Sequence, residues 1–158
     1  MNDIKGVIWD LGGVIVRDNL QSSFIENGVP YNDRVKVAWK NLRLGLIDDI
    51  TFYKESLSGT PYEHLTEVIR KKGDELIQLQ EDGALPLVKE VFALKNYQQG
   101  IISNHSSRWG KEIVERWNLD ALMNLIVISA DVHLDKSTRT IFDYTLSGMQ
   151  LKPTSYLY

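Results

Sequence analysis

The sequence predicts an α/β fold in which an open, parallel, Rossmann-like sheet carries a helical insertion after its first strand. Three observations favour this fold. Short apolar runs at 4–9, 100–103 and 125–128 are typical of strands buried on both faces of a parallel sheet. A long stretch with helical periodicity, 18–96, separates the first run from the second. After position 100, strand-like and helix-like segments alternate, as they do in parallel sheets.

The first expected strand ends at Asp10. Val7, Ile8 and Trp9 are the β-formers of the run at 4–9, and two glycines at 12–13 then break the strand pattern. A second short apolar run follows at 14–16. Asp10 therefore stands at the carboxyl end of a buried strand, where open α/β sheets bind their ligands.

The insertion begins with two expected helices. The apolar positions of the first recur on one face: Val35, Ala38, Trp39 and Leu42. Gly45 follows as its stop, and Asp48 or Asp49 can cap the second helix. The expected buried face of that second helix carries three residues: Ile50, Tyr53 and Leu57.

Two further helices are expected before residue 96. Thr60 is a good N-cap, Pro61 suits the first helical position, and Glu63 completes a capping box. The apolar residues that continue this helix are Leu65, Val68, Ile69, Leu76 and Leu79. The apolar residues that mark the next one are Leu87, Val88, Val91 and Leu94.

Strands and helices alternate in the last third of the chain. After the strand at 100–103, Ser106 and Ser107 can cap a helix, and we expect His105 to lie on the surface at its start. The apolar positions of this helix are Trp109, Ile113 and Trp117. Another helix, with Ile141, Tyr144 and Thr145, follows the strand at 125–128. Residues 156–158 open one more strand.

Composition excludes several classes of function. The 158-residue chain has no cysteine, so disulfides, thiolate metal sites and a cysteine nucleophile are excluded. Its net charge of −3 argues against a nucleic-acid surface, which needs a basic patch. No apolar run reaches the ~18 residues of a membrane span, and no secretory signal precedes the first strand. We therefore expect a cytoplasmic protein without nucleic-acid or membrane partners.

Four polar residues follow expected strand ends or occupy a later loop: Asp10, Ser103, Asn104 and Lys136. Taken singly, each has an ordinary structural explanation. An Asp before two glycines is common in turns, Ser and Asn often cap the next helix, and a lone Lys is usually solvated. The case for a functional site rests on the order in which these residues occur along the chain and on the segments around them.

Three stretches resemble, in order, the motifs of the haloacid dehalogenase (HAD) superfamily. Residues 4–15, IKGVIWDLGGVI, resemble its first motif, an apolar strand that ends in a nucleophilic Asp before a glycine-containing turn. Residues 100–104, GIISN, resemble the second motif, and 129–136, SADVHLDK, followed by Ile-Phe at 141–142, resemble the third. Residues 44–52, LGLIDDITF, are similar to a stretch common in the helical caps of this superfamily. The Asp-Leu-Gly-Gly sequence is similar to that of a cap-bearing branch of sugar-phosphate phosphatases.

The resemblance implies a Mg²⁺-dependent phosphohydrolase that acts on a small phosphorylated metabolite. Asp10 would be the nucleophile and form an aspartyl-phosphate. Mg²⁺ would be bound by Asp10, the backbone carbonyl of Gly12 and an acidic residue after the fourth strand. Ser103 and the Asn104 backbone would donate hydrogen bonds to the phosphoryl oxygens, and Lys136 would neutralise charge on the nucleophile and the transferring group.

The resemblance also divides the chain into two parts. Residues 1–17 and 97–158 would form the HAD-like core, and residues 18–96 would form a helical cap that closes over the site and selects substrates. The sequence ends at Tyr158, before the Asp-Asp pair of the fourth motif, so we expect the core to be truncated at that end.

Several residues depart from the pattern of the superfamily. Gly12 stands where most of its phosphatases carry an Asp as general acid/base, a role worth about 10²–10⁴ in rate. Its carbonyl can still bind Mg²⁺. His133 replaces a usual Gly, and Ser137 replaces a usual Pro. Asp131 and Asp135 fall in the third-motif loop and are not assigned as metal ligands.

Two other functions remain open at this stage. The missing acid at Gly12 and the absent fourth motif favour a catalytically impaired or inactive HAD-fold protein that binds or regulates. A haloacid dehalogenase, ranked last, would use the same Asp10 without metal and without an acid, because halide leaves unprotonated. The sequence specifies neither the substrate nor the oligomeric state.

Overall fold

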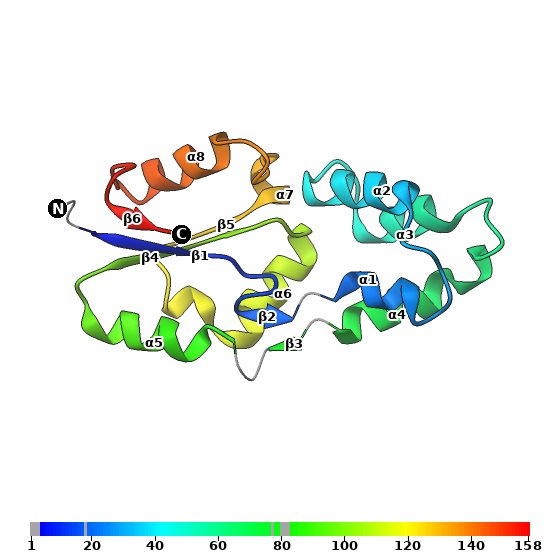
Figure 1. Cartoon of the computed structure of the whole chain (residues 1–158), viewed down its shortest axis with the longest axis horizontal. Coiled ribbons are helices and arrows are strands. Elements are labelled where there is room, and N and C mark those ends of the chain that lie inside the picture. The colour runs from blue at the N-terminus through cyan, green and yellow to red at the C-terminus, as the bar shows by residue number, and fades with distance from the viewer. Residues whose placement is uncertain (1–3, 18, 77, 80–82) are drawn as a thin grey trace.

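A parallel, four-stranded sheet forms the centre of the molecule (Figure 1). The computed structural model describes residues 4–17, 19–76, 78–79 and 83–158. The strands of this sheet are β1 (Gly6–Trp9), β4 (Gln98–Ser103), β5 (Leu125–Ile128) and β6 (Tyr156–Leu157). Their order is β5-β4-β1-β6, and each neighbouring pair is parallel. The predicted α/β fold with an open parallel sheet is confirmed.

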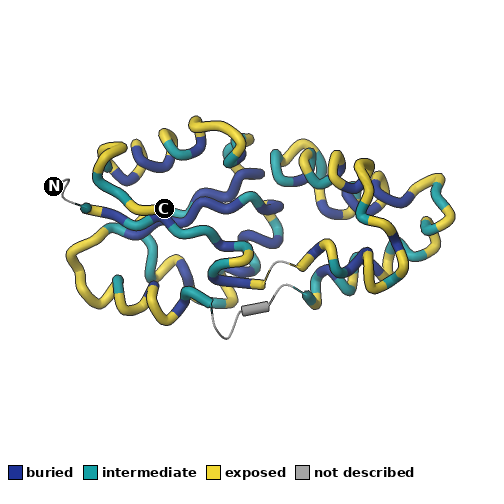
Figure 2. Tube along the Cα trace, in the orientation of Figure 1, coloured by how far each residue is buried: buried dark blue, intermediate teal, exposed yellow. Residues whose placement is uncertain are grey.

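Helices cover both faces of this sheet. α8 (Thr140–Gly148) lies over one face, and α5 (Leu85–Leu94) and α6 (Ser107–Trp117) lie over the other (Figure 1). Successive strand residues point to opposite faces, so Ile102 packs with the α8 side and Ile101 packs with the other side. Figure 2 shows buried residues along the strands. Burial on both faces explains why these strands are apolar runs without alternation.

The inserted helices pack together beyond the carboxyl ends of the strands (Figure 1). They are α1 (Leu20–Ile25), α2 (Asp33–Arg43), α3 (Asp49–Leu57) and α4 (Thr66–Leu76). The chain enters and leaves this group through a short antiparallel pair, β2 (Val16–Arg17) with β3 (Gln78–Leu79). We call α1–α4 the cap. No helix in the described ranges is long and apolar enough to cross a membrane.

The helix α5 packs against the sheet, although it falls within the range 18–96 expected for the cap. Its Leu85 and Val88 are buried. The side-chain amide of Gln99 on β4 donates to the carbonyl of Val88 at 3.2 Å. Just before the helix, the N–H of Ala84 donates to the carbonyl of Val14 at 3.0 Å. In this structure α5 is therefore a helix of the sheet layer.

Local hydrogen bonds set the helix starts. Asp48 caps α3 by accepting the N–H of Thr51 at 2.7 Å, as predicted. The prediction of a helix that starts at Thr60 is wrong. The Glu63 carboxylate accepts the N–H of Gly59 at 2.8 Å, so no capping box closes on Thr60. A 3₁₀ turn, Glu63–Leu65, therefore precedes α4.

Two apolar residues lie where the helical pattern did not place them. Ile50 is 53% exposed, because the buried face of α3 is formed by Phe52, Tyr53 and Leu57. Leu79 was expected on a helix, but it lies in β3. Both errors arise from reading a short segment by periodicity alone, since tertiary packing decides which face is covered.

An aromatic cluster joins the cap to the sheet layer. The ring of Trp109 on α6 lies 6.4 Å from that of Trp39 on α2 and 6.3 Å from that of Tyr53 on α3. All the α-helices of the cap contribute to the same buried core as the sheet side. Gly73 on α4 is required here, because a Cβ atom would stand 2.2 Å from the Tyr53 hydroxyl.

Candidate active site

The predicted site residues meet at the carboxyl edge of the sheet. Asp10 directly follows β1, and Ser103 is the last residue of β4. Because these strands are parallel and pair Trp9 with Ile101, both residues emerge at the same edge. Ser103 is buried, with 1% of its surface exposed. The edge that the sequence indicated as the ligand site therefore carries the predicted nucleophile and phosphate donor side by side.

Lys136 reaches this edge from a separate loop. Its Nζ lies 2.5 Å from Oδ2 of Asp10, with the Lys136 side chain 16% exposed and the Asp10 side chain 30% exposed. An ion pair in such a partly shielded site is stronger than a surface pair, because water screens it less. The ammonium group is placed to neutralise negative charge that gathers at the Asp10 carboxylate.

Asn104 holds the loop that carries this lysine. Its side-chain carbonyl accepts the backbone N–H of Lys136 at 3.1 Å. The sequence assigned Asn104 only as a backbone donor to phosphate, so this contact adds a structural role for its side chain. The second and third motif-like stretches, 32 residues apart at this contact, are thereby joined directly.

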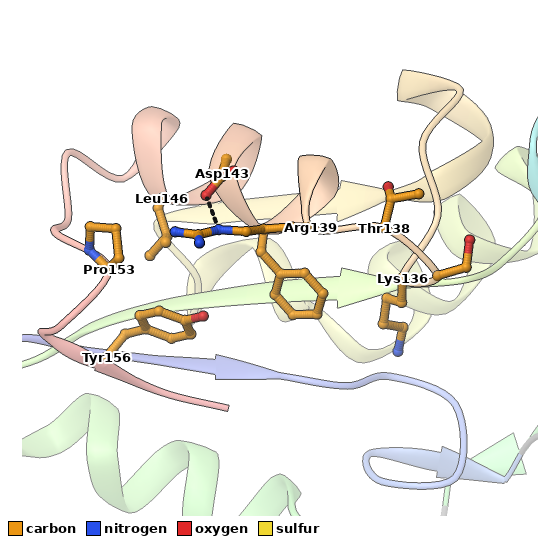
Figure 3. A pocket seen from close by; sticks show the side chains of 9 residues that line it. Lys136, Thr138, Arg139, Asp143, Leu146, Pro153 and Tyr156 are labelled. Atoms are coloured by element: carbon orange, nitrogen blue, oxygen red, sulfur yellow. Dashed lines mark hydrogen bonds and ion pairs between the residues drawn. The ribbon is translucent and has the colours of Figure 1, made fainter.

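A cavity of about 480 Å³ opens beside Lys136. Phe142 is one of its lining residues. Figure 3 shows the cavity between α8 and β6, with Leu146 and Tyr156 on its walls and Lys136 pointing toward the loop after β1. Lys136 Nζ also lies 5.8 Å from the ring centre of Tyr158. The lysine therefore lies between an accessible cavity and the carboxylate at the sheet edge.

The turn after Asp10 is fixed by backbone hydrogen bonds. The N–H groups of Ile15 and Val16 donate to the carbonyl of Leu11, and the N–H of Gly13 donates to the carbonyl of Val16 at 2.8 Å. Gly13 has a φ of +76°, which favours glycine. Gly12 lies within this tight turn, two residues after the predicted nucleophile, and forms an isolated backbone bridge with Val16.

The residues present supply two of the oxygen ligands that Mg²⁺ prefers. They are the Asp10 carboxylate and the Gly12 carbonyl. No group of three or more acidic or imidazole side chains stands ready for a metal within the part of the chain that the structure describes. Mg²⁺ commonly takes one or two carboxylates and completes its shell with water and substrate phosphate, so these residues fit such an ion.

The segment 129–136 was expected to be a loop, but it begins with the short helix α7 (Ser129–Val132), and its two acidic side chains contact neighbouring elements. Asp131 accepts a hydrogen bond from the Ser107 hydroxyl at 2.5 Å. Asp135 is buried and pairs with Arg43 of α2 at 3.0 Å. Burial raises the pKa of Asp135, but hydrogen bonds from Ser137 and the charge of Arg43 outweigh it, so its pKa lies below the usual value.

His133, which stands where the superfamily motif would have a glycine, has a backbone conformation that favours glycine. Its φ is +56°, a left-handed conformation that costs a non-glycine residue about 1 kcal/mol or more. Its Nδ1 lies 2.8 Å from the carbonyl of Leu44 at the end of α2. The imidazole thus makes a contact with the cap that glycine could not make.

The prediction that His105 lies on the surface is wrong. Its residue surface is fully buried, and its ring packs edge-on against Trp39 at 6.3 Å and Trp109 at 6.0 Å. No local pattern could reveal this, because Trp39 is distant in the sequence. His105 therefore belongs to the aromatic cluster between cap and sheet layer.

Arg108 and Trp109 at the start of α6 also bind the cap, and sequence reasoning did not find these contacts. Arg108 Nε donates to Asp49 of α3, and its Nη2 donates to Oδ1 of Asp74 of α4 at 2.7 Å. Trp109 Nε1 donates to the same Asp74 oxygen at 2.7 Å. Hydrogen bonds raise the pKa of Arg108 despite its partial burial. These residues hold two cap helices against the sheet layer.

Gly45 marks the closest approach of cap and sheet layer, so its replacement should be costly. A Cβ atom there would lie 2.3 Å from the carbonyl oxygen of Ala130, and the φ of Gly45 is +68°. We expect Gly45→Ala to lower the free energy of unfolding by about 2–4 kcal/mol, from backbone strain and overpacking together. Chemical denaturation measures this change.

Gly59→Ala is the matched control for that prediction. Gly59 has the same φ of +68°, but nothing lies within 4 Å of its Cβ position. It should lose only the strain component, about 1–2 kcal/mol. Equal losses in the two variants would contradict a close contact between Gly45 and Ala130.

Comparisons with known proteins agree on the fold. No protein-family model and no curated protein sequence matches the chain. A predicted HAD-like family hydrolase of Porphyromonas gingivalis superposes with a TM-score of 0.74 at 18% identity, over 97% of this chain and 80% of that one. A HAD family enzyme of Bacteroides thetaiotaomicron gives 0.72 at 16% identity, over 98% and 83%. A variant of that enzyme was crystallised with magnesium and inorganic phosphate.

Dehalogenases share the same architecture. The L-2-haloacid dehalogenase of Xanthobacter autotrophicus superposes with a TM-score of 0.62 at 13% identity, over 97% of this chain and 68% of that one. At such identities the likeness concerns the fold, and reactions must be argued from the site itself. The parallel sheet, the cap beyond its carboxyl edge and these superpositions identify the chain as having the haloacid-dehalogenase-like hydrolase fold.

Proposed function

We propose that this chain is a phosphohydrolase that acts on a small phosphorylated metabolite through an aspartyl-phosphate on Asp10. The observation that carries the proposal is the 2.5 Å ion pair between Lys136 Nζ and Asp10 Oδ2 at the carboxyl edge of the sheet. A carboxylate nucleophile and a phosphoryl group are both negatively charged, so negative charge accumulates where they meet. A cation beside the nucleophile, such as Lys136, offsets this charge.

The reaction divides into two displacements at phosphorus. A carboxylate oxygen of Asp10 forms a bond to phosphorus as the bond to the substrate oxygen breaks, and water then displaces the carboxylate to release phosphate. Lys136 neutralises charge in both steps, and Ser103 at the end of β4 donates to a phosphoryl oxygen. Gly12 carries no acid, so the departing oxygen takes its proton from water.

Mg²⁺ is the cofactor that this site would hold, with Asp10 and the Gly12 carbonyl as protein ligands. When bound, it supplies a Lewis acid for the phosphoryl oxygens. The chain's own contribution is to fix the two ligands on the rigid turn after β1. The net charge of −3 and the cavity of about 480 Å³ beside Lys136 suit a small metabolite and not a nucleic acid.

Removal of divalent metal should abolish phosphate release. We expect the chain to release phosphate from p-nitrophenyl phosphate or sugar phosphates in Mg²⁺, and the rate to fall by about 10²-fold or more with EDTA, since one ion commonly contributes several kcal/mol. Phosphate is measured by a coupled assay, and restored Mg²⁺ is the control. A rate that EDTA leaves unchanged would contradict the metal assignment.

Dehalogenation, ranked last from the sequence, is a further candidate, and its chemistry tolerates Gly12. Halide departs without a proton, so that reaction needs no acid at position 12 and no metal. Chloride release from 2-chloropropionate in EDTA, lost in Asp10→Asn, would replace the phosphatase proposal. Absence of chloride release from a sample that hydrolyses phosphate esters would remove this candidate.

A binding or regulatory role is another candidate. It is favoured by the missing acid at Gly12 and by the few metal ligands among the described residues. It predicts that inorganic phosphate binds, in calorimetry, with no turnover of any phosphate ester and no effect of Asp10→Asn on a partner's activity. Turnover that depends on Asp10 would exclude it.

A further inference from the structure

One ion pair links the cap to the loop that carries Lys136. Arg43 is the last residue of α2, and its Nη2 lies 3.0 Å from Oδ2 of Asp135. The Asp135 side chain is only 4% exposed and the Arg43 side chain 24% exposed. Asp135 is 92 residues away from Arg43 in the sequence and immediately precedes Lys136. Loss of one partner from such a pair is strongly destabilising, because the other charge is left buried without a counter-charge.

On the loop side, Asp135 fixes the backbone on both sides of the lysine. Its Oδ1 accepts the N–H of Ser137 at 2.9 Å and also the Ser137 hydroxyl. The N–H of Lys136 itself donates to Asn104 at 3.1 Å. The conformation of this loop decides where Lys136 Nζ lies relative to Asp10.

On the cap side, two further contacts hold the end of α2 against the short helix α7 (Ser129–Val132) and its C-cap His133, which precede this loop. The Ser129 hydroxyl donates to the carbonyl of Arg43 at 2.5 Å, and His133 Nδ1 lies 2.8 Å from the carbonyl of Leu44. These contacts use backbone carbonyls of the cap. The Arg43–Asp135 pair is the contact that reaches the residue next to Lys136.

We infer that Arg43 and Asp135 are positioning residues that couple the seating of α2, and not of α3 or α4, to the placement of Lys136 against Asp10. With α2 seated, Arg43 holds Asp135, Asp135 holds the 135–137 turn, and the ammonium group meets the nucleophile. With α2 unseated, Asp135 loses its counter-charge and the lysine loses its fixed position. The catalytic part of this inference rests on the proposed phosphohydrolase function.

The test uses two variants that break the pair and one control. Arg43→Gln removes the cation. Asp135→Asn removes the charge but keeps an oxygen that can accept from Ser137. Arg108→Gln is the matched control, because Arg108 bonds the cap residues Asp49 and Asp74 without touching the 135–137 turn. Thermal melting checks that each variant folds.

The first readout needs no activity. In two-dimensional NMR of the ¹⁵N-labelled full chain, the amide signal of Lys136 should shift in Arg43→Gln, which is remote in sequence, and stay in place in Arg108→Gln. A Lys136 signal that is unmoved in Arg43→Gln, or moved equally by Arg108→Gln, overturns the coupling. This result does not depend on whether the chain hydrolyses phosphate esters.

The second readout is the division of the effect between kcat and KM for p-nitrophenyl phosphate. We expect either pair variant to lower kcat by about 10- to 100-fold, the effect of a catalytic group misplaced by about 1 Å. KM should change little, and the double variant should be no worse than the more impaired single variant. Arg43→Lys should recover part of kcat. Additive losses, or an equal loss of kcat in Arg108→Gln, would overturn the assignment.

Discussion

Asp10→Asn should lower kcat for phosphate ester hydrolysis by about four orders of magnitude or more, because removing a covalent nucleophile eliminates the first displacement. Asn keeps the size of the side chain but lacks a nucleophilic carboxylate. The variant also removes the ion pair with Lys136 and one of the two proposed Mg²⁺ ligands. Phosphate release under saturating Mg²⁺ measures the effect.

The fold should survive this change. Asparagine keeps an oxygen that can accept a hydrogen bond from Lys136 Nζ, and at 30% exposure of the Asp10 side chain water can solvate the ammonium group that loses its counter-charge, so the loss of stability should be modest. The melting temperature of Asp10→Asn should therefore stay close to that of the unaltered chain. A variant that melts normally and keeps more than a tenth of kcat would contradict a nucleophilic role for Asp10.

Lys136→Met should lower kcat by about 10²–10³-fold, the range found when one charge-stabilising donor is removed from a preorganised site. Methionine preserves much of the aliphatic stem, and the backbone N–H that Asn104 binds is unaffected. The fall in kcat should therefore measure the contribution of the ammonium group alone. Steady-state kinetics with p-nitrophenyl phosphate measures it.

Arg139→Gln is the control for the lysine variant. Arg139 lines the same cavity, but its side chain is 75% exposed and pairs with Asp143, away from Asp10. It should leave kcat nearly unchanged. If the two substitutions had similar effects, general positive charge in the cavity, and not the contact with Asp10, would explain the rate.

The sequence was sufficient for the sheet and for the predicted residues at its edge. A strand that is buried on both faces leaves a continuous apolar run, so 125–128 was located without error. Asp10 follows one such run and Ser103 is the last residue of another, and parallel pairing of their strands brings them to one edge. Their shared location is therefore a consequence of topology. Their chemical roles remain predictions.

The contacts between cap and sheet layer could not be predicted from the sequence. Arg43 with Asp135, and Arg108 with Asp49, join residues far apart in the chain, and each residue alone resembles an ordinary surface charge. The burial of His105 depends on Trp39 for the same reason. Local propensity also failed at Ile50, since packing of the cap decides which face of α3 is covered.

The most direct test of the central claim is to trap the covalent intermediate. The chain is mixed with substrate and Mg²⁺, quenched in acid within one turnover, digested and analysed by mass spectrometry. We predict that the peptide containing Asp10 gains the mass of one phosphoryl group on that residue, and that hydroxylamine removes it. Phosphate release at full rate with no modified Asp10 peptide in the quenched sample, under conditions where a known acyl-phosphate is recovered, would contradict the account.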